Sequence, residues 1–266
     1  MRKVGSTTDT ADANGEYTNG NVANGISPTI INAEMMNTFQ RELVNVVEGA
    51  GLELDPDDDS QVLKAIGGGR LLNIITFTKS GTYTPSKGTK RVRVKIWGGG
   101  GSGKGIAAQG GAASGAGGGY VEGIYQLPAG ESFPIVVGKG GEAIPAGSGS
   151  DGISGGDSSF SALNLLATGG RGGIGSTGNS KGGTGSSPSL GLIISVSGQG
   201  SQGATGNNLG GVGGAAHSSF GGLPHVASAG DTGGFPGGGG AGASYDSVPQ
   251  ASGAGGDGLV IIEELS

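Results

Sequence analysis

One stretch of this sequence imitates a phosphate-binding loop. Residues 98–103 followed by Lys104 have the glycine and lysine spacing of such a loop, and they follow a segment that alternates like a strand. A phosphate-binding loop also needs a serine or threonine after the lysine to hold Mg²⁺, and position 105 is glycine. It must open a helix, whereas residues 106–111 are mostly alanine and glycine. We interpret the match as chance in a glycine-rich region and expect no nucleotide cofactor.

Asp55, Asp57 and Asp59 have the spacing of the first three ligands of a calcium loop. The sixth position of that loop should be glycine and is Ser60, and the twelfth should be glutamate and is Ile66. The same residues suit a turn and the start of a helix, where negative charge is favourable. We therefore expect a structural role for this segment and no metal.

His217 and His225 are the two histidines of the chain. In a trimer, three copies of one of them could meet on the axis as a metal site; otherwise they are ordinary loop residues, and the sequence leaves this open. No local motif supports a Ser-His-Asp triad or a pair of catalytic carboxylates, although residues far apart in the sequence could still meet. The expectation is a protein that is not an enzyme and holds no cofactor.

Glycine dominates the composition, with 65 of the 266 residues, several times its usual share of about 7%. The net charge of −6 disfavours nucleic-acid binding, because phosphate contacts need a basic face. The absence of cysteine excludes disulfides and zinc thiolates, and it fits assembly in a reducing cytosol. We expect no leader segment, and no apolar run is long enough to span a membrane, so we expect no membrane insertion.

The first part of the chain changes from an arm to a helical segment. Residues 1–31 are polar and without periodicity, which indicates an extended arm. In residues 32–69, Asn32 is suited to cap a helix. An apolar stripe follows at helical spacing, made of Met36, Phe39, Leu43, and Val46 or Val47. A second short helix is expected after residue 57. Helices of this size cannot bury their stripes alone, so we expect the stripe to serve oligomerisation or attachment to a partner.

Residues 70–266 have the two-residue period of strands. The clearest strand spans residues 91–97, where Val92, Val94 and Ile96 alternate with basic side chains and Trp97. Further strands are expected at residues 74–78, 120–127, 133–137, 160–166, 190–195 and 259–263. Between residues 98 and 258 about one residue in three is glycine, in clusters that break any collagen-like period.

The glycine clusters have two interpretations. They could be flexible linkers, or they could form extended left-handed helices of the polyglycine type, which pack backbone to backbone and bond through their N–H groups. The regular strands between the clusters, and a strong last strand, favour order. The expected fold is mainly β with a small N-terminal helical segment: a glycine-rich β-sandwich-like domain with polyglycine II helices, assembled as a trimer.

Two stretches carry a resemblance to a known family. Residues 4–66, with GSTTDTA at 5–11 and NTFQRELV at 37–44, resemble the N-terminal region of tail fibres from contractile-tailed phages and prophages. Residues 74–264 resemble the glycine-rich domain at the ends of phage fibres. That second resemblance rests on GTYT at 81–84, IWGGGG at 96–101, GGYV at 118–121 and GDGLVI at 256–261. The glycine clusters are also similar to those of fibre-tip adhesins that pack polyglycine helices in layers.

The resemblance implies a structural and adhesive role in a virion, with assembly in the host cytoplasm and a homotrimeric state. Residues 1–66 would attach to a tail or baseplate protein. Residues 70–266 would bind a host outer-membrane protein or a surface saccharide. The alternatives are a non-adhesive structural spacer and a polysaccharide-degrading tail spike.

Receptor contact is expected in the segments that interrupt the glycine clusters late in the chain, because glycine itself offers little chemistry and binding residues usually lie on loops. The candidates are Leu190, Leu192, Ile193, Phe220, Leu223, Pro224, His225, Phe235, Pro236, Tyr245 and Asp246. Ile193 and Phe220 could equally belong to the core. Phe235, Tyr245 and His225 are favoured, because nearby glycine or proline disfavours a buried strand.

Overall fold

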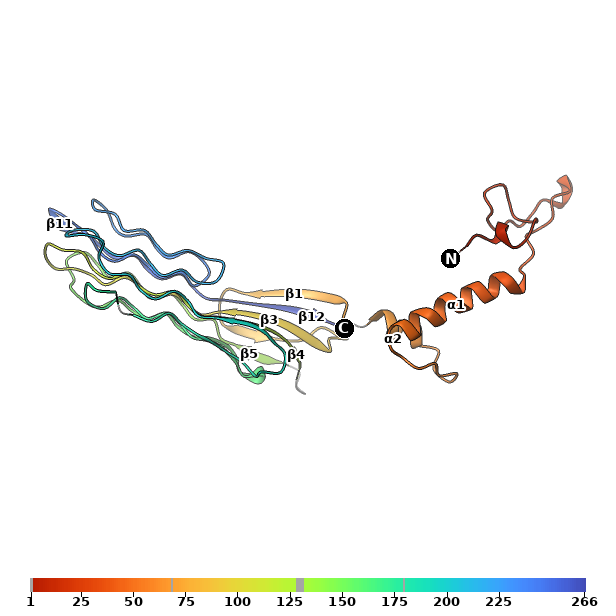
Figure 1. The fold of residues 1–266 in the computed structure, drawn as a ribbon, viewed down its shortest axis with the longest axis horizontal. Coiled ribbons are helices and arrows are strands. Elements are labelled where there is room, and N and C mark those ends of the chain that lie inside the picture. Colours follow the sequence, from red (N-terminus) through yellow and green to blue (C-terminus); the bar gives the residue numbers. More distant parts are fainter. Residues whose placement is uncertain (1, 68, 128–131, 179) are drawn as a thin grey trace. The chain divides into compact units, whose positions relative to one another are not determined.

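The structure is a computed structural model that describes residues 2–67, 69–127, 132–178 and 180–266. It divides into two compact units, Met1–Arg70 and Leu71–Ser266, which are described separately (Figure 1). The division falls where the sequence changes from helical to strand-like periodicity. Within the described residues, no helix is both long and apolar enough to cross a membrane.

The first unit contains two α-helices, α1 (Ala33–Gly49) and α2 (Gln61–Gly67). The side-chain oxygen of Asn32 caps α1 by accepting a 3.0 Å hydrogen bond from the backbone N–H of Met35. After the helix, Gly51 has a φ of 74°, a conformation that favours glycine. Both helices and the cap agree with the sequence prediction.

Residues 2–31 are not the extended arm that the sequence predicts. They contain two short 3₁₀ turns, η1 (Val4–Ser6) and η2 (Val22–Asn24). The side-chain amide of Asn32 donates a 2.6 Å hydrogen bond to the carbonyl oxygen of Thr7, and both Val4 and Met35 are buried. The segment therefore packs on the start of α1. Bonds between side chains and backbone hold it, and these leave no periodic pattern in the sequence.

The predicted apolar stripe of α1 lies mostly on the surface of the first unit. Met36 and Leu43 are 52% and 53% exposed, Val46 is exposed as well, and Phe39 is partly buried. Val47 differs because it is buried, so it stabilises the unit itself and is not free to contact a partner.

A five-stranded antiparallel sheet forms one layer of the second unit, in the order β1-β12-β3-β4-β9. Its strands are β1 (Leu71–Phe77), β12 (Leu259–Leu265), β3 (Arg91–Trp97), β4 (Tyr120–Gln126) and β9 (Leu192–Val196). The last strand, β12, lies between β1 and β3, so the chain closes the sheet across all the glycine-rich segments. Val92, Val94 and Ile96 are fully buried on one face, as their alternation predicts.

Two smaller sheets cover the buried face. Their strands are β2 (Gly81–Tyr83) with β5 (Phe133–Ile135), and β6 (Ser158–Phe160), β7 (Leu165–Ala167) and β8 (Gly185–Ser186). The core lies between the layers, where the rings of Tyr83, Phe133 and Phe160 have centroids 5.9–6.3 Å apart. The fold is therefore mainly β with antiparallel sheets and two short helices near the N-terminus, as predicted.

Residues 160–166 form two strands where the sequence predicts one. After Phe160 the 3₁₀ turn η3 (Ser161–Leu163) follows, and Asn164 has a left-handed conformation with a φ of 54°. Asparagine tolerates that conformation better than most residues. Both Phe160 and Leu165 lie in the core after the chain reverses. A tight hairpin here therefore buries the same apolar residues that a continuous strand would bury.

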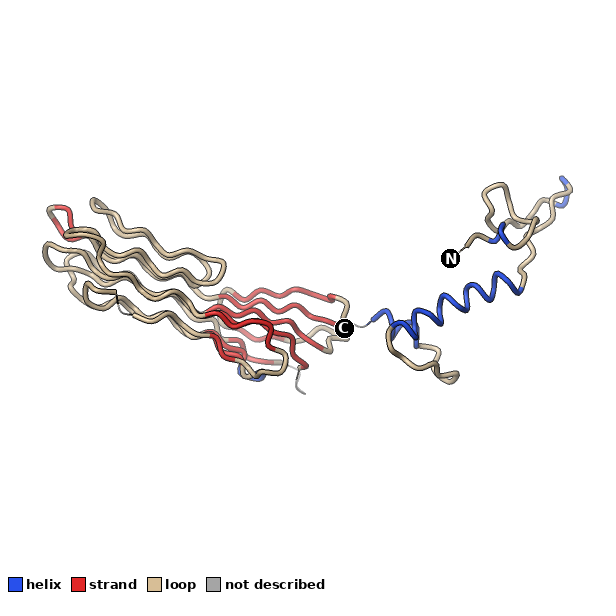
Figure 2. Tube along the Cα trace, in the orientation of Figure 1, coloured by secondary structure: helices blue, strands red, loops and turns tan. Residues whose placement is uncertain are grey.

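Glycine-rich segments extend beyond the sandwich and run side by side (Figure 2). Segment 98–105, which continues β3, donates its backbone N–H groups to three neighbouring segments in turn. The N–H groups of residues 98, 101 and 104 donate to the carbonyl oxygens of residues 119, 116 and 113. The N–H groups of residues 99, 102 and 105 donate to a second segment, at residues 156, 153 and 150. Those of residues 100 and 103 donate to a third, at residues 256 and 253. The hydrogen-bond pattern therefore repeats every three residues, and each of these partners runs antiparallel to the segment.

Other segments donate hydrogen bonds to segment 98–105. Its carbonyl oxygens accept from residues 170 and 173, from 240 and 243, and from 141. The segment is therefore bonded to six neighbours. Segment 112–119 is bonded in the same way: it donates to segments 168–175, 199–202 and 237–243, and it accepts from residues 98–104, 183 and 211–214. We call this hydrogen-bonded array the glycine lattice.

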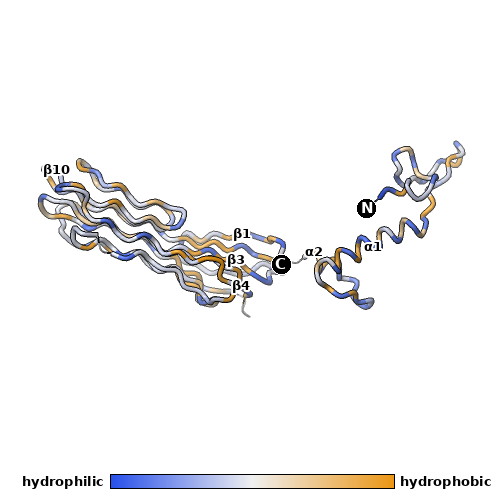
Figure 3. Tube along the Cα trace, viewed as in Figure 1, coloured by the Kyte–Doolittle hydropathy of each residue, from blue (hydrophilic) through white to orange (hydrophobic). Residues whose placement is uncertain are grey.

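Glycine positions in the interior of the glycine lattice have no room for a side chain. A Cβ atom added at Gly115 or Gly170 would lie closer than 3.0 Å to a neighbouring carbonyl group. Accordingly, segment 112–119 is buried throughout and consists of glycine, alanine and serine. Figure 3 shows the strongest apolar colour over the strands of the sandwich, while the lattice is mostly pale. The second unit therefore has two cores, one of side chains and one of backbone.

Candidate recognition surface

The glycine lattice has one end at the sheet and one end away from it. Segment 98–105 leaves β3 and segment 112–119 enters β4, so the turn at residues 106–111 lies away from the sheet (Figure 2). Further turns lie at the same end, at residues 145–149, 174–178, 204–209, 224–229 and 245–250. We call these six turns the far-end loops.

Hydrogen bonds join the far-end loops to one another and to the lattice. Two backbone bonds of 2.9 Å link neighbouring loops, from Ala204 to Ser176 and from Tyr245 to Asn208. A third bond, of 3.1 Å, joins Gly230 to Ala251, the residues that directly follow the loops at 224–229 and 245–250. The ammonium group of Lys104 donates to the carbonyl oxygen of Gly149 and to the carboxylate of Asp151, both at 2.7 Å. The loops therefore form one surface on a base that the lattice holds in place.

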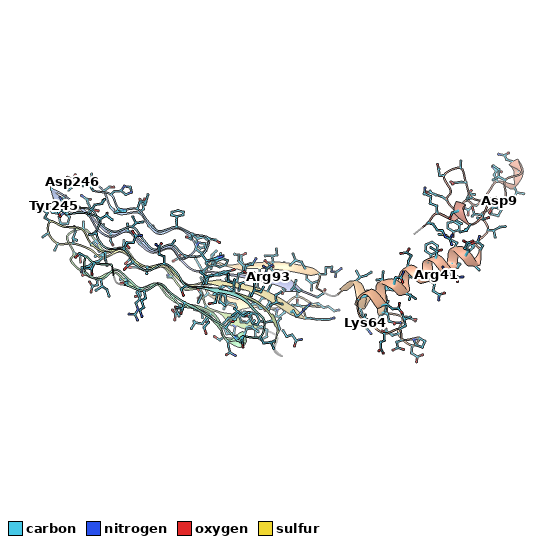
Figure 4. All side chains as sticks on the ribbon, viewed as in Figure 1. Asp9, Arg41, Lys64, Arg93, Tyr245 and Asp246 are labelled. Carbon is cyan, nitrogen blue, oxygen red and sulfur yellow. The ribbon has the colours of Figure 1, made fainter. Side chains whose placement is uncertain are left out.

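A tight hairpin, β10 (Tyr245–Asp246) with β11 (Val248–Pro249), is part of this surface. Ser247 turns the chain with a φ of 58°. Asp246 and Val248 are exposed, and Tyr245 is partly buried. Figure 4 shows Tyr245 and Asp246 at the end of the lattice. Both predicted residues therefore belong to the far-end loops.

A second group of predicted residues lies in the neighbouring loop. The backbone N–H of Asp231 donates a 2.9 Å hydrogen bond to the carbonyl oxygen of Leu223 and closes the turn. His225 Nε2 lies 3.0 Å from Asp231 Oδ1. Leu223 and His225 are exposed, while Pro224 is partly buried. This loop presents an apolar side chain and an imidazole at the far end.

The remaining aromatic candidates lie at the sheet end instead. The indole N–H of Trp97 donates a 2.9 Å hydrogen bond to the carbonyl oxygen of His217, which places the turn before Phe220 beside the sheet. The backbone N–H of the residue before Phe235 donates to Phe220, so these two exposed rings lie on adjacent turns. Pro236 is buried, so it is not part of any contact surface.

Three more predicted residues are exposed on or just before the edge strand β9: Leu190, Leu192 and Ile193. Leu190 has the largest exposed fraction of the three, 89%. Ile193 and Phe220 are therefore not core residues.

The predicted receptor-binding residues do not form one patch. They divide into a far-end group and a sheet-end group, because the chain reverses at both ends of the lattice and the sequence does not tell the two kinds of turn apart.

Sequence reasoning missed three exposed aliphatic residues of the far-end loops, Ile174, Val226 and Val248. Each stands in a short segment between glycine clusters, which is the signal that selected the other candidates. Among the side chains of the far-end loops, His225, Tyr245 and Asp246 are the ones that can ionise. Beside these loops, Asp151 pairs with Lys104, and Asp231 lies 3.0 Å from His225. The surface therefore offers apolar contact and hydrogen bonding from hydroxyl and amide groups, with a few paired charges beside it.

His217 has a packing role at the sheet end. Its ring stacks on that of Tyr120 with centroids 4.0 Å apart and 5° between the planes, and Tyr120 in turn lies 4.6 Å from Trp97. In the part of the chain that the structure describes, no three His, Cys, Asp or Glu residues are grouped so that they could hold a metal ion. Whether three copies of one histidine meet on the axis of a trimer is a question that the single chain does not test.

The face of the five-stranded sheet that points away from the core carries an ion cluster. The guanidinium of Arg93 donates to Glu122 at 2.7 Å, and Lys95 lies 2.6 Å from Glu263. Burial raises the pKa of Glu122, but hydrogen bonds from Tyr120 and Arg93 outweigh it and hold that pKa below its usual range. The charges neutralise one another, which indicates a structural cluster.

The profile of the glycine-rich domain family matches residues 76–264, which is the sandwich with its glycine lattice. The chain therefore belongs to this family. None of the curated proteins compared with the chain matches it.

Proposed function

We propose that this chain is a tail-fibre adhesin of a phage or phage-derived particle. In this proposal the first unit attaches to a tail or baseplate protein, and the far-end loops of the second unit bind a host outer-membrane protein or surface saccharide. The observation that carries the proposal is that loops with exposed apolar and hydrogen-bonding side chains are joined into one surface at the end of a hydrogen-bonded lattice. The protein performs no catalysis in this role, and it is part of a virion assembled in the host cytoplasm.

The lattice segments are, in this proposal, polyglycine II helices. A helix with three residues per turn directs successive N–H groups to three neighbours, and the three-residue repeat of hydrogen bonds along segment 98–105 supports that geometry. Ordering glycine costs a large amount of conformational entropy. The hydrogen bonds that each segment makes to several others at once offset this cost. The result is a stiff base that can hold recognition loops away from the body of a fibre.

The non-adhesive spacer is the main alternative, and the far-end loops argue against it. Val248 and Ile174 are each more than half exposed there, and so is Leu223, which directly precedes the loop at residues 224–229. A spacer has no use for apolar side chains at its end, whereas a binding surface uses them for contact area. A polysaccharide-degrading spike would need paired carboxylates, whereas Asp151 and Asp231 beside the far-end loops are paired with Lys104 and His225.

Attachment and trimerisation belong to the first unit in this proposal. The exposed stripe of Met36, Leu43 and Val46 supports contact with other chains, because the small first unit leaves these apolar side chains in water. Phe39 contributes its exposed part to the same contact. A homotrimer would bury three stripes together.

Adsorption to host cells tests the proposed function. The full chain carrying Leu223→Ser and Val248→Ser should compete with particles for host cells at least about tenfold less well than the unchanged chain, since each lost apolar contact costs on the order of 1 kcal/mol. The matched control carries Leu190→Ser and Phe220→Ser at the sheet end and should compete normally. Equal competition by both variants, with unchanged melting temperatures, would overturn the proposal.

A further inference from the structure

A cavity of about 430 Å³ lies where the glycine lattice joins the sheets of the second unit. Three segments line it: residues 78–80 after β1, residues 137–139 after β5, and Asp257 before β12. Its volume falls within the range of about 300–1,000 Å³ that is usual for small-molecule sites. None of the lining residues belongs to the far-end loops, so the cavity is separate from the proposed recognition surface.

Hydrogen bonds join the three segments that line the cavity. The backbone N–H of Val137 donates a 3.0 Å hydrogen bond to Oγ of Ser80. The backbone N–H of Gly140 donates a 2.7 Å hydrogen bond to Oδ1 of Asp257. Val137 and Gly138 are buried and form the inner part of the lining. The single chain therefore builds the cavity from fixed segments without a ligand.

Two of the lining residues are lysines whose charge the chain does not neutralise. Among the described residues, neither Lys79 nor Lys139 forms an ion pair, whereas Lys95 and Lys104 have carboxylate partners at 2.6 Å and 2.7 Å. Both cavity lysines are exposed, and their flexible stems let the ammonium groups turn toward a common ligand. Like charges at one cavity repel each other, and an anion between them removes that repulsion. Asp257 is the one acidic residue of the lining, so the cavity favours an anion.

The other polar groups of the lining suit the hydroxyl groups of a sugar ring. Oδ1 of Asp257 accepts the bond from the backbone, and the second carboxylate oxygen can accept from a ligand hydroxyl. Thr78 is exposed, and its hydroxyl group has no hydrogen bond among the described residues. A bare anion would use the lysines but would be repelled by Asp257. A ligand that combines an acid group with hydroxyl groups can use the lysines, the carboxylate and the threonine together.

We propose that this cavity binds a sugar that carries an acid group, either a carboxylate or a phosphate. The acid group lies between Lys79 and Lys139, and hydroxyl groups of the ring bond to Asp257 and Thr78. A sugar of this kind is part of an acidic saccharide, so the site gives the second unit a saccharide contact away from the far-end loops. This inference goes beyond the proposed function and does not depend on what the far-end loops bind.

NMR titration of the full chain tests the site with four probes: glucuronate, glucose 6-phosphate, glucose and inorganic phosphate. At least one of the two acidic sugars should bind with a dissociation constant in the millimolar range, at least about tenfold more tightly than glucose or inorganic phosphate. The tighter of the two acidic sugars identifies the acid group. Glucose that binds equally well would remove the role of the lysines, and inorganic phosphate that binds equally well would remove the role of the ring. Either result, or no binding of either acidic sugar, would overturn the proposal.

Variants of the lysines place the binding in the cavity. Lys79→Gln with Lys139→Gln should weaken binding of the acidic sugar at least about tenfold at an unchanged melting temperature, because both side chains are exposed. The matched control, Lys87→Gln with Lys181→Gln, removes the same charge from exposed lysines outside the cavity and should bind like the unchanged chain. Binding that is the same in both double variants would contradict the site. The far-end variant described above should bind the sugar normally, so a failure of this site leaves the adhesin proposal standing.

Discussion

The hydroxyl group of Tyr83 donates a 2.8 Å hydrogen bond to Oε1 of Glu264, which joins a strand near the start of the second unit to its last strand. The backbone N–H of Ser86 donates to the same oxygen at 2.9 Å, and Glu264 is fully buried. Burial raises the pKa of Glu264, but the hydrogen bonds from Ser86 and Tyr83 outweigh it and hold that pKa below its usual range. A charged carboxylate therefore fixes the end of the chain to the second layer of the sandwich.

This arrangement predicts a pH-dependent stability. A carboxyl group with a lowered pKa in the folded state stabilises the fold above its unfolded pKa of about 4.3, and it loses that contribution as the pH falls through the folded value. Glu264→Gln should cost about 1.5–3 kcal/mol at neutral pH, the usual value of hydrogen bonds to a charged group. Thermal melting of both proteins should show the difference narrowing in acid. A difference that stays constant across the pH range would contradict this account.

The glycine lattice predicts position-specific effects of added side chains. Gly170→Val and Gly239→Val place a side chain against carbonyl groups closer than 3.0 Å, so each should lower the melting temperature by at least about 5 °C. Gly206→Val is the matched control, because no atom lies within 4 Å of its added Cβ. If the first two variants melt like the control, the glycine segments are linkers.

The exposed stripe of α1 predicts an effect on assembly. Leu43→Asp places a charge on the stripe and should shift the full chain toward monomers by at least about tenfold in the association constant, because a buried unpaired charge is costly. Asn45→Asp adds the same charge on the opposite side of the helix and should leave the mass unchanged. Sedimentation of both variants measures the outcome, and an unaffected Leu43→Asp oligomer would show that the stripe does not mediate assembly.

Local patterns account for what the sequence predicted well. The cap at Asn32 and the alternation along β3 depend on residues a few positions apart, and both agree with the structure. The turn at Asn164 was missed because its apolar neighbours suit a strand as well as a hairpin. The packing of residues 2–31 on α1 was missed because single polar contacts, such as that between Asn32 and Thr7, have no sequence period.

The candidate surface was harder to predict than the fold. The lattice joins residues as far apart in the sequence as Gly100 and Gly256. Glycine has no side chain whose type could indicate which segments are neighbours. The sequence therefore identifies the interruptions between glycine clusters, and it does not tell at which end of the lattice each one lies. Tyr245 and Phe235 follow similar glycine-rich runs, yet they lie at opposite ends.

The exchange of far-end loops between fibres tests the central claim most directly. Residues 204–209, 224–229 and 245–250 would be replaced by the matching loops of a fibre with a different host range, and adsorption to both hosts would be measured after folding is confirmed by thermal melting. The account predicts that adsorption follows the transplanted loops, while exchange of the sheet-end turns around Phe220 and Phe235 leaves the host unchanged. Adsorption that stays with the original host in the folded far-end chimera would contradict it.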